Sequence, residues 1–95
     1  MRLRFHPAAI AEARAARRWY ADRDPAAAAA FMAELDRATN AIVDLPKAWP
    51  PYEAGTRRFL FKRFPFYAIY RERGEVLEIV AVMHARRRPG YWRDR

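Results

Sequence analysis

The chain has no cysteine among its 95 residues. A disulfide framework and a thiolate metal site are therefore excluded, and the absence fits a reducing compartment, so we expect a cytoplasmic location. Serine is absent as well, and neither Thr39 nor Thr56 has a paired base by sequence, which argues against nucleophilic catalysis. The three glycines stand far apart, so there is no glycine-rich phosphate loop.

Long apolar runs and clusters of metal ligands are also missing. No stretch approaches the ~20 apolar residues that cross a bilayer, and the first residues lack the apolar core of a secretion signal. The two histidines, His6 and His84, have no carboxylate at ligand spacing. We therefore expect no membrane partner, no metal and no cofactor.

Alanine and the aromatic residues divide the chain into two halves. Of the 20 alanines, 15 lie between Ala8 and Ala41, whereas ten of the 14 aromatic residues lie between Trp49 and Trp92. Alanine favours helices, and aromatic and β-branched residues favour strands. The composition therefore predicts helices first and a strand-rich core afterwards, in a single domain over residues 1–95.

Negative charge is scarce, and the net charge is +8. Residues 1–47 hold eight Lys or Arg against six Asp or Glu, and residues 48–95 hold eleven against five. Charge of this kind attracts anions and steers their approach without specifying a fold. The second half is therefore expected to meet a polyanion or an acidic protein partner.

The first half reads as a short strand followed by two helices. Leu3 to Phe5 alternates, Pro7 suits the first turn of a helix that runs to about Ala21, and Asp24 with Pro25 caps and begins the next helix. The second helix carries the clearest apolar stripe of the chain, made of Phe31, Leu35, Ala38, Ile42 and Leu45.

The second half reads as a meander of three strands after a proline-rich loop. The expected strands are Arg57 to Phe61, Pro65 to Arg71 and Val76 to Met83, with a turn over residues 72–75. Alternation places Phe59 and Phe61 on the core face and Arg58 and Lys62 on the other face. The fold class is thus α+β, in the order βααβββ, with the helical hairpin packed on an antiparallel sheet.

Candidate chemistry gathers directly after the last strand. Cleavage of RNA without a metal needs a base, cations near the phosphate and an acid, roles that His84, the run Arg86 to Arg88 and Tyr91 could fill. The alternative is a solvated basic surface in which His84 caps a strand. Arg57, Arg58, Lys62 and Arg63 form a second basic group, which adjoining strands would bring to the same rim of the sheet.

These segments together resemble the RelE/ParE superfamily of toxins from type II toxin–antitoxin pairs. The resemblance covers nearly the whole chain and is most specific in Arg63-Phe64-Pro65-Phe66-x-Ala68-Ile69-Tyr70-Arg71 and in Val82-x-His84-x-Arg86-Arg87-x-Pro89-Gly90-Tyr91-Trp92. It implies the βααβββ order, a cognate antitoxin that wraps the domain, and a toxin–antitoxin hetero-oligomer.

Two targets follow from the resemblance. RelE-like members cleave mRNA in the ribosome, and ParE-like members inhibit DNA gyrase. The candidate site residues of the nuclease pattern are Arg58, Lys62, His84, Arg86, Arg87 and Tyr91, but Leu60 and Tyr67 stand where basic members would be expected. We therefore favour a ParE-like gyrase inhibitor, with a ribosome-dependent mRNA endonuclease and a non-toxic, basic nucleic-acid-binding module as alternatives.

Overall fold

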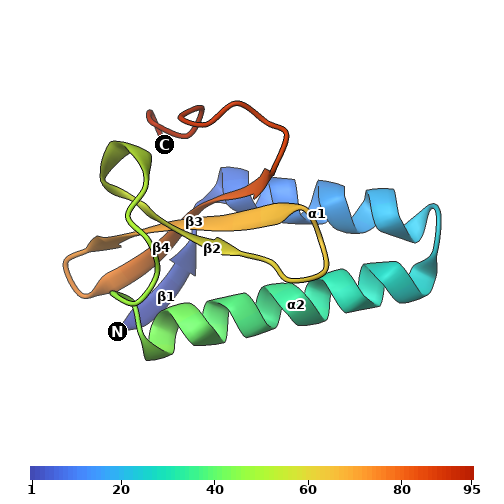
Figure 1. Cartoon of the computed structure of the whole chain (residues 1–95), viewed down its shortest axis with the longest axis horizontal. Helices are drawn as coiled ribbons and strands as arrows, with labels where there is room; N and C mark the ends of the chain where they lie inside the picture. The colour runs from blue at the N-terminus through green and yellow to red at the C-terminus, as the bar shows by residue number, and fades with distance from the viewer.

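The computed structural model describes all 95 residues and has the predicted βααβββ order (Figure 1). β3 continues two residues further than predicted, and the turn to β4 is the pair Gly74–Glu75, with Gly74 at a φ of 60° that favours glycine. The elements are β1 (Arg2–Phe5), α1 (Pro7–Ala21), α2 (Pro25–Asp44), a 3-10 turn (Glu53–Gly55), β2 (Arg57–Leu60), β3 (Phe66–Arg73) and β4 (Val76–His84).

Both helices begin as their sequences predict. The His6 imidazole accepts a hydrogen bond from the N–H of Ala8 at 3.0 Å, and Asp24 Oδ1 accepts one from the N–H of Ala26 at 3.0 Å. Each cap is followed by a proline in the first turn, where the missing N–H costs nothing. The helices therefore form a hairpin with firmly set starts.

The four strands form one mixed sheet in the order β1-β4-β3-β2. The last three strands are antiparallel, as predicted, whereas β1 pairs in parallel with β4, so the sheet is not wholly antiparallel. β1 has four residues and β4 has nine, and their pairing ends at Phe5 and Ile79. Beyond Ile79, therefore, this edge of β4 has no neighbouring strand.

The main core lies between the helical hairpin and one face of the sheet. Phe31 is fully buried there and contacts the rings of Tyr20, Phe61, Phe64 and Phe66, with centroid distances of 5.1 to 5.7 Å. The predicted core orientation of Phe59 and Phe61 is confirmed, since both pack in this cluster. Small residues of the helices, Ala9, Ala13, Ala16 and Ala38, let the helices approach closely.

A β-bulge in β4 shifts the alternation of its side chains between the two faces of the sheet. Ile69 pairs with Ala81 and Tyr70 pairs with Ile79, so Val80 has no partner on β3. Val80 and Ala81 both pack in the cluster of the second face, which Trp92 of the C-terminal segment covers. Both faces of β4 are covered, which explains its unbroken apolar run, and after the bulge Val82 and His84 face α1.

Phe31 is the residue whose truncation should cost the fold most. Phe31→Ala should lower the free energy of unfolding by about 3 to 5 kcal/mol, because it removes buried apolar surface and leaves a cavity among four rings. Phe31→Leu should cost clearly less. Urea denaturation followed by circular dichroism would measure both, and equal, small losses would contradict this description of the core.

Candidate interaction site

The two basic groups meet only in part. Lys62 and Arg63 lie at the end of the sheet where β4 finishes. Arg57, which donates to the carbonyl of Trp49 at 2.7 Å, and Arg58 lie elsewhere, so the expected common rim of all four is wrong. Phe66, the first residue of β3, pairs with His84, the last residue of β4, and the N–H of Ala85 donates to the carbonyl of Pro65 at 2.7 Å. The end of the β2–β3 loop and the start of the segment after β4 therefore lie next to each other, and the C-terminal segment then turns away from the loop (Figure 1). We call the exposed cations of these two segments that form no ion pair, Lys62, Arg63, Arg86 and Arg88, the basic rim.

Glu34 of α2 anchors the β2–β3 loop, which carries Lys62 and Arg63. Glu34 is 3% exposed, and its Oε1 accepts hydrogen bonds from the backbone N–H of Lys62 and of Arg63. Arg37 lies 3.8 Å from Oε2. The other oxygen, Oε2, is buried and accepts no hydrogen bond, so Glu34 anchors the loop through Oε1 alone, while the side chains of Lys62 and Arg63 are exposed.

A second carboxylate, Glu12 of α1, joins the helix to β4 and to the C-terminal segment. Glu12 Oε1 accepts from the N–H of Val82 at 3.0 Å and from Arg95 at 2.8 Å. Its Oε2 accepts from Arg87 at 3.2 Å and from Arg95 at 3.1 Å. Of the candidate cations, Arg87 is therefore already paired, unlike Arg86.

Arg58 lies apart from the rim, on the second face of the sheet. Its guanidinium is 4.6 Å from the ring centre of Tyr52 and 5.1 Å from that of Tyr67. Tyr52 in turn stacks on the buried Trp92 at 5.6 Å. The predicted outward orientation of Arg58 is correct, but its environment is that of a residue that packs the C-terminal segment onto the sheet.

Tyr91 and His84 are both constrained. Burial raises the pKa of the Tyr91 phenol well above its usual range, the Glu12 carboxylate adds to this effect, and the ring lies 3.5 Å from the Arg87 guanidinium. His84 Nδ1 accepts a hydrogen bond from the N–H of Arg86 at 3.0 Å. His84 therefore caps the turn after β4, and Tyr91 is poorly suited to exchange a proton near neutral pH.

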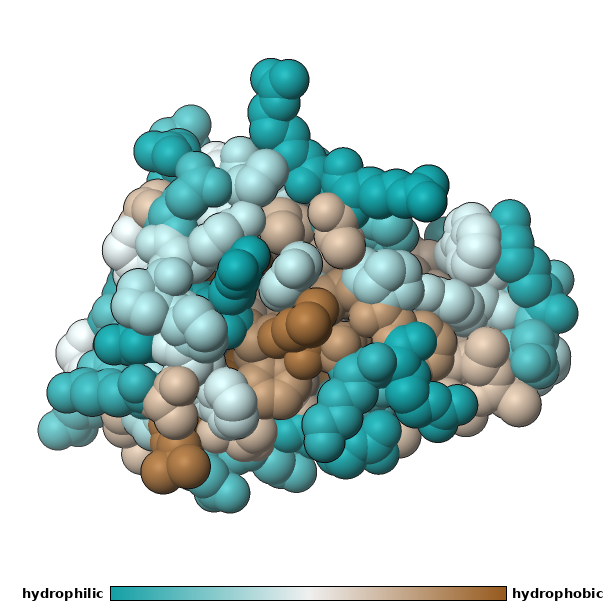
Figure 2. Space-filling model, viewed as in Figure 1, coloured by the Kyte–Doolittle hydropathy of each residue, from teal (hydrophilic) through white to brown (hydrophobic).

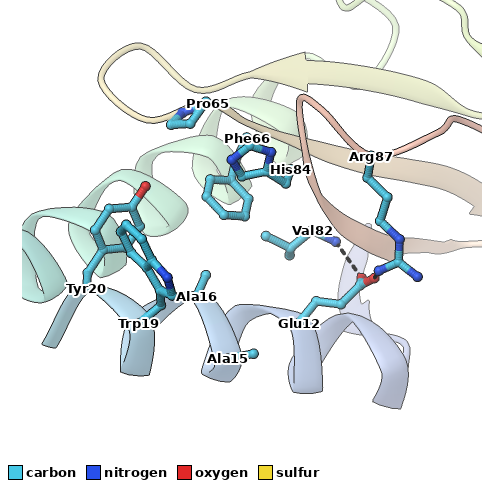
Figure 3. A pocket seen from close by; sticks show the side chains of 10 residues that line it. All are labelled: Glu12, Ala15, Ala16, Trp19, Tyr20, Pro65, Phe66, Val82, His84 and Arg87. Carbon is cyan, nitrogen blue, oxygen red and sulfur yellow. Dashed lines mark hydrogen bonds and ion pairs between the residues drawn. The ribbon is translucent and has the colours of Figure 1, made fainter. Parts of the chain in front are cut away.

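An open groove of about 500 Å³ lies between α1 and the end of β4 (Figure 3). Figure 3 shows the rings of Trp19 and Tyr20 at one end and the pair of Glu12 and Arg87 at the other. Trp19 is 53% exposed, although a tryptophan is costly to leave in water. The remaining lining residues are Ala15, Ala16, Pro65, Phe66, Val82 and His84.

Apolar surface also reaches solvent beside the rim. Leu60, at the end of β2, is 56% exposed. Figure 2 shows brown surface in the middle of this view, over β2 and beside α2, with hydrophilic side chains around it. No group of three His, Cys, Asp or Glu side chains lies close enough to hold a metal ion, and neither helix combines the length and the hydropathy of a membrane span.

Sequence reasoning found the rim but missed the side chains that organise it. The pattern of the two helices does not indicate that Glu12 and Glu34 bind β4 and the β2–β3 loop, since each is a single glutamate on an alanine-rich helix. Nor does any periodic pattern around Trp19 or Arg95 indicate the groove or the pairing with Glu12. The sequence does carry one signal for Glu34, which follows Phe31 by three residues and precedes Ala38 by four, and so lies on the apolar face of α2.

The fold and the basic rim define a class of small, basic α+β proteins with a helical hairpin on a four-stranded sheet. The family model of the ParE toxin of the type II toxin–antitoxin system parDE matches residues 3–89. Because this match spans most of the chain, the protein belongs to the ParE toxin family. The superfamily resemblance that the sequence predicts is thereby confirmed.

Solved structures agree on the fold. A chain of the chromosomal ParDE toxin–antitoxin system from P. aeruginosa superposes with a TM-score of 0.71 and 21% sequence identity, over 88% of this chain and 95% of that chain. At this identity the likeness concerns the fold alone. A search of curated proteins finds no match.

Glu12 should matter more for stability than an ordinary surface glutamate. Glu12→Ala should lower the free energy of unfolding by about 2 kcal/mol, because Val82, Arg87 and Arg95 lose their acceptor together. Glu12→Gln should cost less, since the amide oxygen still accepts from Val82. Urea denaturation would test both variants.

The matched control is Glu75→Ala in the exposed turn between β3 and β4, where no ion pair is lost. This variant should stay within about 0.5 kcal/mol of the original protein. A loss for Glu12→Ala no larger than for Glu75→Ala would show that the Glu12 contacts contribute nothing.

Proposed function

We propose that this protein is a toxin that inhibits growth when free, is neutralised by a cognate antitoxin in a hetero-oligomeric complex, and acts on DNA gyrase. Membership of the ParE toxin family is the observation that carries the proposal. The net charge of +8 and the paired basic segments suit a protein that meets anionic partners in the cytoplasm.

The groove beside α1 supports the antitoxin part of the proposal. It offers an apolar floor with an exposed tryptophan at one end and an arginine at the other, about 500 Å³ in all. An amphipathic segment with apolar residues and a carboxylate would complement both ends. Trp19 would be the anchor, since exposed tryptophans are frequent hot spots of binding.

The choice of gyrase over mRNA rests on the state of the candidate catalytic side chains. Tyr91 is half-buried with a raised pKa, Arg87 is neutralised by Glu12, and His84 is engaged through Nδ1 with the N–H of Arg86. A ribonuclease needs an acid and a base that exchange protons with substrate. A toxin that inhibits its target by binding needs neither.

Growth arrest followed by two target assays tests the proposal. Inducing the chain alone in bacteria should stop growth, and the purified protein should inhibit supercoiling by gyrase while total mRNA stays intact. Plasmid relaxation by topoisomerase I serves as the control and should be unaffected. Cleaved mRNA with normal supercoiling would favour the endonuclease, and harmless expression of folded protein would overturn the toxin assignment.

The groove can be tested separately from the target. Ala15→Arg places a long cationic side chain in the groove. The variant should still arrest growth, but its rescue should need at least ten times more inducer of the co-expressed antitoxin. Ala11→Arg, an exposed position of α1 outside the groove, is the matched control and should leave rescue unchanged. Equal rescue of both variants would remove the groove from the antitoxin contact.

A further inference from the structure

The four side chains of the basic rim have no acidic partner. Lys62, Arg63, Arg86 and Arg88 are all exposed, and none of them takes part in an ion pair. They come from two segments that are joined by the hydrogen bond from the N–H of Ala85 to the carbonyl of Pro65. Four uncompensated charges are thus gathered at one end of the sheet.

The carboxylates nearest to the rim are turned inward. Glu34 is buried under the loop and accepts from backbone N–H groups, and Glu12 is 14% exposed and saturated by Val82, Arg87 and Arg95. Neither carboxylate can fold over the rim without leaving buried donors unpaired, which would cost free energy. The rim therefore keeps its positive potential in the free protein.

The surface of the rim is mainly charged. Phe61 and Phe66, at the two ends of the loop, are buried and Phe64 is half-buried, so the one large apolar side chain exposed beside the rim is Leu60 at the end of β2. An amphipathic protein segment needs an apolar floor, which the groove beside α1 has and the rim lacks. Arginine forks on such a surface match phosphate oxygens.

We propose that the basic rim binds the phosphate backbone of nucleic acid, independently of base sequence. The ligand contacts Lys62 and Arg63 on the loop and Arg86 and Arg88 after β4, while the groove stays free for a protein partner. The contact goes beyond the gyrase proposal and does not depend on it, because it is a property of the isolated chain.

Fluorescence anisotropy with the purified full chain tests this proposal. The probes are a labelled 20-base-pair DNA duplex and a labelled 20-nucleotide RNA of unrelated sequence, each titrated over a range of salt concentrations. About four phosphate contacts predict a slope of log K against log salt of roughly −3.6 for the duplex and −2.8 for the single strand. Which probe binds more tightly identifies the preferred form of the backbone.

Two double variants of the rim locate the contact, and a third double variant on α1 serves as the control. Lys62→Ala with Arg63→Ala, and Arg86→Ala with Arg88→Ala, should each weaken binding by roughly tenfold or more and make the salt slope shallower by about 2. Arg14→Ala with Arg17→Ala is the matched control, since it removes the same charge from exposed, unpaired positions of α1. This control variant should keep the binding affinity and the salt slope within about twofold of those of the original chain.

Each other outcome overturns the proposal. If neither probe binds at 0.1 M salt, the rim is not a nucleic-acid site. If the α1 variant weakens binding as much as the rim variants do, the binding is attraction by net charge alone. If poly-glutamate displaces the probe as strongly as DNA of equal charge does, the rim is a site for acidic proteins. All six positions are exposed, so the variants should keep the circular dichroism spectrum and unfolding midpoint of the original chain.

Discussion

The edge of β4 beyond Ile79 needs partners for its backbone, because β1 is too short to supply them. Polar backbone groups left unpaired inside a protein cost free energy, so side chains take the place of the missing strand. Glu12 of α1 accepts from the N–H of Val82, and Arg95 donates to the carbonyl of Val80 at 3.0 Å. Since Glu12 and Arg95 also pair with each other, the helix, the strand and the C-terminal segment are fixed to one another at this point.

The same arrangement separates two surfaces of different chemistry. Glu12 neutralises Arg87 at the mouth of the groove, whereas Arg86 and Arg88 on either side of it in sequence remain unpaired. Alternate residues of one basic run thus serve different surfaces: Arg87 closes the polar end of an apolar groove, and its two neighbours extend the rim. A count of arginines in the sequence cannot make this distinction, because it depends on which guanidinium reaches the helix.

Much of the fold follows from local sequence rules, and the site follows only in part. The starts of the helices at Pro7 and Pro25, the cap at Asp24 and the stripe of α2 depend on neighbours in sequence, and the structure agrees with them, except that α2 ends before Leu45 and leaves this predicted member of the stripe 60% exposed. The bulge at Val80 changes which face each later residue occupies, and an unbroken apolar run carries no record of it. The contact of Glu12 with Arg95 joins residues 83 positions apart, and no periodic pattern reveals such a pair.

The C-terminal segment illustrates why residue type alone is a weak guide to catalysis. Histidine, arginine and tyrosine within eight residues suggest proton transfer on phosphate, yet here Tyr91 lies between the guanidiniums of Arg87 and Arg95 and Trp92 is fully buried on the second face. Arg58 packs against Tyr52, the ring that stacks on this tryptophan. Most of the candidate set thus holds the segment in place, and a segment so anchored presents a fixed pattern of charge, which is what recognition by binding requires.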